Sequence, residues 1–180
     1  MSTDEAEKKA RQTWETPQDF FNILDSEVGG FDIDVAGDAF NSKCQNFIDE
    51  ANDALSLDWF WKLHLKGTMD KAWCNPPYNN PVLWVDKAIE QVNAEPGAVV
   101  YMLLNHDAST KWYSQALENA SEIRILTKKR VQFIAPDGIT PSSNSKAQCV
   151  IVFRRKLASA PCHVWHWDWA KDLEAFNDGD

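Results

Sequence analysis

The 180-residue chain has no long apolar run. No stretch approaches the roughly 18 apolar residues that a membrane-spanning helix needs, which argues against an integral membrane protein. The opening residues, Met1-Ser2-Thr3-Asp4-Glu5, lack the basic and apolar regions of a secretory signal peptide. We therefore expect a protein with no membrane partner that acts in the cytoplasm.

Cysteine is scarce and follows no binding pattern. The four cysteines include no Cys-X-X-Cys pair, and several lie in apolar surroundings where a free cysteine behaves as a small hydrophobe. Cys162, His163 and His166 could supply three zinc ligands, but their spacing matches no common zinc module and a fourth ligand is not evident. The sequence therefore predicts reduced thiols and no metal site.

Basic residues are also in short supply, with a formal net charge of −9. This charge at first argues against a nucleic-acid partner, because Lys and Arg drive phosphate binding by releasing counterions. Many of the acids lie at the two ends, however, which leaves 19 acids and 17 bases in residues 8–167. Binding to DNA then depends on whether the basic runs 128–130 and 154–156 cluster on one face.

The length and the 44% hydrophobic content allow one well-packed domain. We expect a flexible N-terminal tail over residues 1–12, a single domain over residues 13–169 and an acidic C-terminal tail over residues 170–180. Residues 162–169 alternate tryptophans with other residues, which predicts an edge strand with one tryptophan face. That face either packs over the sheet or forms a contact between two copies in a homodimer.

Hydrophobic periodicity predicts alternating strands and helices. Strands are expected over residues 31–35, 72–74, 98–104 and 122–126, and helices over residues 17–28, 82–92 and 109–120, with Thr16 and Ser109 as N-caps. Residues 42–48 and 58–61 are expected to form a short helix and a helical turn. Two more strands, 131–134 and 147–153, have no helix between them, which predicts an α/β fold with a mostly parallel sheet and an antiparallel end.

The most informative motif is Asn75-Pro76-Pro77-Tyr78. Four given residues in this order should occur by chance in about one chain in a thousand of this length. The motif follows a buried strand and precedes a helix, so it lies beyond the carboxyl end of a strand, where open α/β sheets bind ligands. The motif is therefore a candidate catalytic loop.

The residue types of this loop suit methylation of an aromatic amine. Such an amine is a poor nucleophile because its lone pair is delocalised into the ring. If the Asn75 side-chain oxygen and the Pro76 carbonyl each accept one amino hydrogen, the lone pair becomes localised on nitrogen, and proline presets where the carbonyls point. Tyr78 offers an aromatic face on which an extruded base can stack. Asn75 acts as an acceptor and not as a base, because a carboxamide takes no proton near neutral pH.

With Thr13-Trp14-Glu15-Thr16-Pro17 near the start, this loop resembles the phage DNA adenine methyltransferase (Dam) family, over roughly residues 13–154. Further matching stretches are Asp34-Val35-Ala36 with Asn41, Lys43 and Cys44, Leu55 with Asp58-Trp59, Leu103-Leu104 with Thr110-Lys111-Trp112, and Arg130-Val131-Gln132-Phe133. The resemblance implies a compact Rossmann-like sheet, S-adenosylmethionine as the cofactor, and methyl transfer to the exocyclic amino group of adenine in double-stranded DNA. The chain departs from the commoner methyltransferase pattern after Asp34, where a glycine-rich turn is expected and only Gly37 is present.

The resemblance also implies roles for individual residues. Trp14, Thr16 and Pro17 would hold one side of S-adenosylmethionine, with the start of the first helix favouring its carboxylate. Asp34, beside Ala36, would accept from its ammonium group. Asp53 or Asp58 would take the ribose hydroxyls, as an acidic residue does in related nucleotide-binding folds.

No separate target-recognition domain is visible, so DNA contacts are expected from loops. The candidate loops are 105–113, 127–130 and 135–147, and the candidate phosphate contacts are Lys111, Lys128, Lys129, Arg130 and Lys146. Two other functions stay open at this point. The catalytic motif also serves methylation of protein glutamine and of RNA bases, and the chain could be a catalytically silent binding module.

Overall fold

The computed structural model describes residues 14–60, 70–135, 139–141, 144–157 and 159–178. Its strands are β1 (Ile33–Asp34), β2 (Lys71–Cys74), β3 (Val99–Asn105), β4 (Glu122–Leu126), β5 (Gln148–Arg154) and β6 (His163–Trp167). Its helices are α2 (Gln18–Val28), α3 (Pro81–Ala94), α4 (Lys111–Asn119) and α5 (Trp169–Asp178), with a short 3-10 helix, η1 (Glu50–Asn52). None of the described helices is long and apolar enough to cross a membrane.

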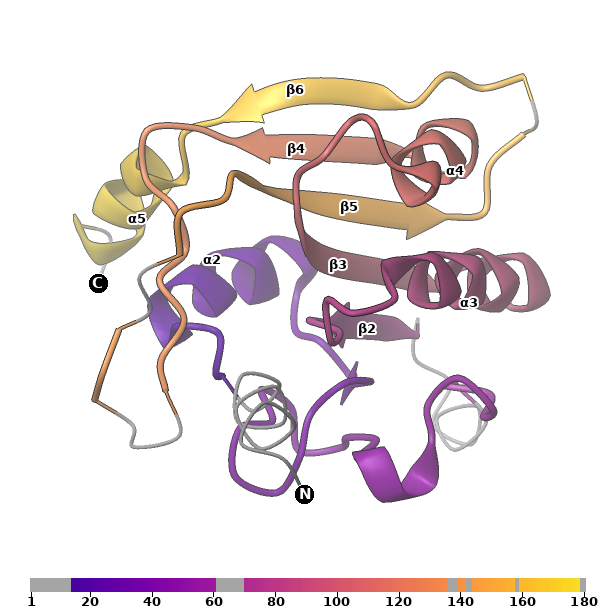
Figure 1. The fold of residues 1–180 in the computed structure, drawn as a ribbon, viewed down its shortest axis with the longest axis horizontal. Coiled ribbons are helices and arrows are strands. Elements are labelled where there is room, and N and C mark those ends of the chain that lie inside the picture. Colours follow the sequence, from indigo (N-terminus) through magenta and orange to yellow (C-terminus); the bar gives the residue numbers. More distant parts are fainter. Residues whose placement is uncertain (1–13, 61–69, 136–138, 142–143, 158, 179–180) are drawn as a thin grey trace.

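The six strands form one sheet in the order β1-β2-β3-β5-β4-β6 (Figure 1). The pairs β1–β2, β2–β3 and β4–β6 are parallel, whereas β5 runs antiparallel to both β3 and β4. The predicted α/β fold with a mostly parallel sheet is thus confirmed. The antiparallel strand lies inside the sheet, between β3 and β4, where the apolar run of residues 149–153 is fully buried.

Helices cover both faces of the sheet, and alternate residues of β3 pack on opposite sides. Val100, Met102 and Leu104 belong to the core that includes residues of α3 and α4. Tyr101 and Leu103 belong to the core that includes residues of α2. This two-sided burial explains why β3 is a continuous apolar run instead of an alternating one.

Helix α2 follows its sequence pattern at one end and departs from it at the other. It ends at Gly29, whose φ of 75° is the left-handed conformation that glycine adopts at a helix C-terminus. At its start, Pro17 is the N-cap and no side chain caps the helix, so the prediction of Thr16 as N-cap and Pro17 as first helical residue was wrong. The Thr16 hydroxyl accepts a hydrogen bond from Asn75 instead.

The C-terminal tryptophans pack over the sheet, which was one of the two arrangements predicted for them. β6 is the edge strand next to β4, and Trp165, Trp167 and Trp169 all contact the core beneath α2. The Phe20 ring lies 5.1 Å from Trp169 and 5.7 Å from Trp167, measured between centroids. Residues 169–178, expected mainly as an acidic tail, form α5 beside α2 (Figure 1).

Four local predictions were wrong. Residues 43–46 form bends and Phe47 makes an isolated bridge to Asp34, instead of a helix over 42–48. Residues 59–60 form a bend, and Trp61 lies outside the described residues. Residues 131–134 form no strand, and Ile134 makes two isolated bridges, to Glu15 and to Pro141. Thr110, and not Ser109, is the N-cap position of α4, because Ser109 donates to Asp107.

One charged cluster is buried within the far half of the sheet. The Arg124 side chain on β4, 6% exposed, pairs with Glu27 of α2 at 2.6 Å and with Glu122 at 3.0 Å. Its guanidinium carbon also lies 5.4 to 5.6 Å from the ring centroids of Tyr101, Trp165 and Trp167. This cluster, here called the Arg124 cluster, joins α2 to β4 and β6.

Candidate active site

The parallel strands β1, β2 and β3 end at the same edge of the sheet, and a pocket opens there. We call it the Asp34 pocket. It is lined by Trp14, Glu15, Thr16, Asp34, Ala36, Asn41, Lys43, Trp73 and Asn75. The structure thus brings together the predicted cofactor residues Trp14, Thr16, Asp34 and Ala36 with Asn75 of the predicted catalytic loop.

Both ends of the Asn75 carboxamide are held. Its Nδ2 donates to Thr16 Oγ1 at 3.2 Å, and its Oδ1 accepts from the Tyr78 hydroxyl at 3.1 Å. Pro76 is buried directly behind it, and Pro77 and Tyr78 are half-buried. The predicted acceptor is therefore fixed in orientation before any substrate arrives, which is what stabilising a transition state requires.

The Tyr78 ring lies against Phe133, with 6.2 Å between centroids and 63° between planes. Tyr78 packs on both hydrophobic cores, and burial raises the pKa of its hydroxyl, so the group stays protonated and acts as a donor at neutral pH. Sequence reasoning found the 130–133 stretch as a match but gave Phe133 no role. Its position beside Tyr78 makes it a second aromatic surface at the catalytic loop.

The segment before α2 is fastened to the segment that contains Phe133. The Glu15 N–H donates to the Ile134 carbonyl at 2.8 Å, and the Ile134 N–H donates to the Glu15 carbonyl at 2.9 Å. The buried Gln148 side chain accepts from the Val131 N–H at 2.7 Å and donates to the Val131 carbonyl. A side-chain amide thus takes the place of the strand neighbour that residues 131–134 lack.

Asp34 ends β1 in an almost closed environment, with 3% of its surface exposed. Its two oxygens accept from the N–H groups of Ala36 and Lys43, at 3.1 and 3.0 Å. Burial raises the pKa of Asp34 to about 6, against the lowering effect of these two hydrogen bonds. The carboxylate is therefore ionised at neutral pH and attracts a cationic partner.

Gly37 allows the chain to wrap around this carboxylate. A Cβ at this position would stand 2.9 Å from Asp34 Oδ2 and 3.1 Å from the Ser42 Cα. Only glycine leaves enough space for the loop to return so closely over Asp34. Gly37, the single glycine after Asp34, is thus sufficient for the tight turn at a position where the commoner methyltransferase pattern has several glycines.

Lys43 reaches from this loop to the segment before α2. Its ammonium pairs with Glu15 Oε1 at 2.5 Å and donates to Gln18 Oε1 at 3.1 Å. The Lys43 side chain is 3% exposed and that of Glu15 is 34% exposed. Lys43 therefore connects two walls of the pocket.

The lining suits S-adenosylmethionine in its chemistry. Asp34 offers a buried carboxylate for an ammonium group, and Lys43 offers a cation. Trp14, which is partly exposed, offers an aromatic side chain near them, whereas the Trp73 ring is buried against Phe21 and Phe31. Pro17, although adjacent to Thr16, is not among the lining residues.

Two predicted ribose contacts lie outside the pocket lining. Asp53 is exposed at the end of η1, where its φ is 48° and its side chain accepts from the Leu55 N–H. Asp58 is also exposed, and its side chain accepts from the Phe60 N–H. Each carboxylate has a local role in its turn, and a ribose role for either stays a prediction.

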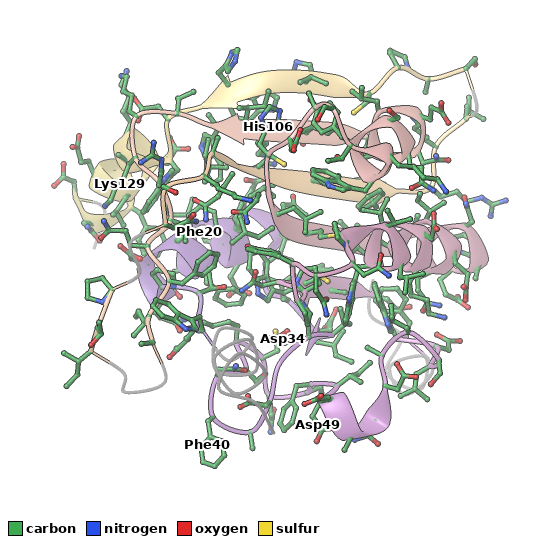
Figure 2. The ribbon with its side chains drawn as sticks, in the orientation of Figure 1. Phe20, Asp34, Phe40, Asp49, His106 and Lys129 are labelled. Carbon is green, nitrogen blue, oxygen red and sulfur yellow. The ribbon has the colours of Figure 1, made fainter. Side chains whose placement is uncertain are left out.

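The five predicted phosphate contacts are all exposed and come from segments at the carboxyl edge of the parallel strands: Lys111, Lys128, Lys129, Arg130 and Lys146. Two of them have partners within the protein. Lys128 pairs with Asp168 at 2.6 Å, and Lys129 lies 4.4 Å above the Trp169 ring. Figure 2 shows Lys129 beside α5 and well separated from Asp34, so any DNA that touches both must extend along this edge.

Sequence reasoning missed Glu15, Asn41, Lys43 and Trp73 as pocket residues. Asn41 and Lys43 belonged to stretches that match the family, but they were given no role. Glu15 lies between Trp14 and Thr16, two predicted cofactor contacts. Trp73 precedes the catalytic loop by two positions. Trp73 could have been predicted, because it lies near the end of the same strand as Asn75. Lys43 could not, because its place in the pocket depends on how loop 35–43 folds.

The sequence has relatives among known proteins. A family described as DNA N-6-adenine-methyltransferase (Dam) matches residues 3–172. The chain is 34% identical over 164 residues to the DNA N-6-adenine-methyltransferase of Haemophilus phage HP1 (strain HP1c1), covering 87% of this chain and 86% of that protein. It is 35% identical over 113 residues to the protein of the same description in Escherichia phage T1, covering 63% of this chain and 44% of that one. The putative methyltransferase YfdM of Escherichia coli (strain K12) is 35% identical over 72 residues, covering 39% of this chain and 76% of that one.

Proposed function

Since this chain belongs to the Dam family of DNA N-6-adenine-methyltransferases, we propose that it binds S-adenosylmethionine in the Asp34 pocket and methylates an adenine held at Asn75–Tyr78. The observation that carries this proposal is the pocket itself. It joins the Asp34 carboxylate at the end of β1 to the Asn75 carboxamide at the end of β2. This supports the proposal, in which Asp34 binds the ammonium of the cofactor and Asn75 binds the amine at the common edge of two parallel strands.

When bound, S-adenosylmethionine supplies an electrophilic methyl group on a sulfonium centre. The residues of the chain prepare the amine. Asn75 Oδ1 has two lone pairs, so it can accept an amino hydrogen of adenine beside the Tyr78 hydroxyl that already donates to it. The Pro76 carbonyl accepts the second amino hydrogen, and the nitrogen lone pair is left to face the methyl group.

Tyr78 and Phe133 hold the base in this proposal. Adenine in a duplex is out of reach of the pocket, so it must be turned out of the stack, as enzymes that modify bases generally require. The half-buried Tyr78 ring provides a face for it, and Phe133 limits the space from the side. Lys111, Arg130 and Lys146 are then available for phosphates along the same edge, and a homodimer is not needed for any of these contacts.

Labelled cofactor tests the proposal directly. The purified chain is incubated with labelled S-adenosylmethionine and, separately, with DNA, RNA and protein. We expect label in DNA alone, on adenine N6, with methylated adenines at a defined sequence when the DNA of cells that express the chain is mapped. Label in RNA or on protein glutamine would show that the substrate is RNA or protein instead of DNA. If the chain did not bind the cofactor at all, it would be a catalytically silent binding module.

A further inference from the structure

The buried ammonium of Lys43 has bonding capacity that the protein does not use. An ammonium group has three N–H donors, and Glu15 and Gln18 accept two of them. In the part of the chain that the structure describes, no third acceptor lies within hydrogen-bond distance of it. Because the group lines the Asp34 pocket and is 3% exposed, bulk water has little access to the remaining donor.

The charges of the pocket complement those of S-adenosylmethionine. Its described lining contains two carboxylates, Asp34 and Glu15, and one cation, Lys43. The lining therefore carries one net negative charge, while the cofactor, with a sulfonium, an ammonium and a carboxylate, carries one net positive charge. Within the lining, Lys43 is the group whose charge is opposite to that of the cofactor's carboxylate.

We propose that Lys43 binds the carboxylate of the methionine part of S-adenosylmethionine while Asp34 binds its ammonium, an assignment that rests on the proposed function. The two cofactor groups are attached to the same carbon atom, so their partners must be neighbours. Lys43 and Asp34 line the same pocket, and the Lys43 backbone N–H donates to Asp34 Oδ2 at 3.0 Å, so the two residues are neighbours. The start of α2, expected from the sequence to favour this carboxylate, contributes neither Pro17 nor Gln18 to the lining.

A pair of ligands that differ only in this carboxylate tests the assignment. Calorimetry measures the dissociation constants of S-adenosylmethionine and of its decarboxylated analogue for the wild-type chain and for Lys43→Gln. Lys171→Gln, which removes an exposed cation on α5, is the matched control. We expect Lys43→Gln to weaken S-adenosylmethionine by about 10- to 100-fold, as for loss of a charge-assisted hydrogen bond, and to change the analogue little.

Equal weakening of both ligands would overturn the assignment, because Lys43 would then act only as a strut between Glu15 and its own loop. If the wild-type chain binds neither ligand, the proposed function is wrong as well. This outcome is distinct from one in which the wild-type chain binds both ligands and Lys43→Gln weakens both equally. Glu15→Gln keeps the test decisive if Lys43→Gln does not fold. It leaves the Lys43 cation in place without its ion pair, so the preference for S-adenosylmethionine over the analogue should be kept or increased, and loss of that preference would refute the assignment.

Discussion

Two buried cations in this protein have nearly the same exposure and different surroundings. The Arg124 side chain is 6% exposed and that of Lys43 is 3% exposed. Arg124 meets two carboxylates and the faces of three aromatic rings. Lys43 meets one carboxylate, which is partly exposed, and one amide oxygen.

The difference separates a charge that serves the fold from one that serves a ligand. A buried charge costs free energy unless its partners replace the water that it has lost. Around Arg124 the protein supplies most of that replacement, with carboxylate acceptors for four of its five N–H donors and three aromatic faces. Around Lys43 we expect part of it to come from whatever enters the pocket. Substitutions in the Arg124 cluster should therefore lower the stability of the fold, whereas substitutions in the Asp34 pocket should lower cofactor binding or turnover.

The largest effect should come from the catalytic loop on the pocket side. Asn75→Ala removes one of the two acceptors of the amino hydrogens, and loss of one preorganised group of this kind lowers kcat by about 100- to 1,000-fold. Calorimetry should find cofactor binding little changed, and thermal unfolding should stay near wild type. Undiminished turnover in this variant would refute the acceptor mechanism.

Arg124→Met should show the opposite pattern. It leaves Glu27 and Glu122 without their cation, and since Glu27 is 43% exposed and can be hydrated, we expect a loss of about 2 to 3 kcal/mol in the free energy of unfolding. Urea unfolding measures this loss, and kcat of the folded fraction should remain near wild type. A kcat that falls in parallel with that of Asn75→Ala would show that the Arg124 cluster is coupled to the site.

Protonation of Asp34 gives a third way to separate the two regions. Its pKa lies near 6 in the free protein, above the ordinary value for aspartate, because it is buried. Ionised Asp34 is the form that attracts the cofactor's ammonium, so affinity should be constant above about pH 7 and fall by about tenfold per pH unit below pH 6. Calorimetry from pH 5 to 8 tests this, and Asp34→Asn should bind weakly with no such step.

A fourth test compares substitutions of Tyr78. Alanine loses stacking worth about 1 to 3 kcal/mol per base, whereas phenylalanine keeps the ring and loses only the hydroxyl that donates to Asn75. Tyr78→Phe should therefore stay active and Tyr78→Ala should not, with a smaller penalty for alanine when the target adenine is mismatched and easier to extrude. Fluorescence of 2-aminopurine at the target position reports the extrusion. Equal damage by both substitutions would transfer the role from the ring to the hydroxyl.

The effect that bears least on the comparison of the two buried cations is that of salt on non-specific DNA binding. With at most five candidate phosphate contacts, the slope of log K against log salt should be no steeper than about −4.5. Lys128 already pairs with Asp168, which makes the slope shallower still. Fluorescence anisotropy from low to moderate salt measures it, and a steeper slope would show that more cations face the DNA than the structure suggests.

The sequence was sufficient for those parts of the site that depend on one strand and its end. Asn75 and Asp34 were predictable because Asn75 follows a buried strand and Asp34 ends one, and parallel strands end at a common edge. Lys43 and Glu15 were not, because their meeting depends on the path of loop 35–43 around Asp34, which the hydrophobic pattern does not encode. The N-cap prediction for Thr16 failed for a related reason, since a hydroxyl next to a helix start can bond to a distant side chain as well as to its own helix.

The same limit explains the errors in secondary structure. Residues 131–134 have the composition of a strand, but among the described residues their backbone makes isolated bridges from Ile134 to Glu15 and Pro141 and hydrogen bonds from Val131 to the Gln148 side chain. The side chains of Val131 and Phe133 are nevertheless buried in the core that includes residues of α2. Their apolar character therefore reflects burial and not membership of a strand. The antiparallel strand was expected at an end of the sheet, and its insertion between β3 and β4 is a matter of topology, which local patterns leave open.

The bridge between Glu15 and Ile134 bears on how the molecule folds. It joins residues more than 100 positions apart, and loop closure over such a separation is entropically costly and slow. Contacts of this range are the ones expected to form after the folding transition state, once β2, β3 and β5 have paired. A ligand that binds only the completed pocket then leaves the folding rate almost unchanged and slows unfolding. Cofactor in the cell would thus prolong the lifetime of the folded enzyme without helping it to fold.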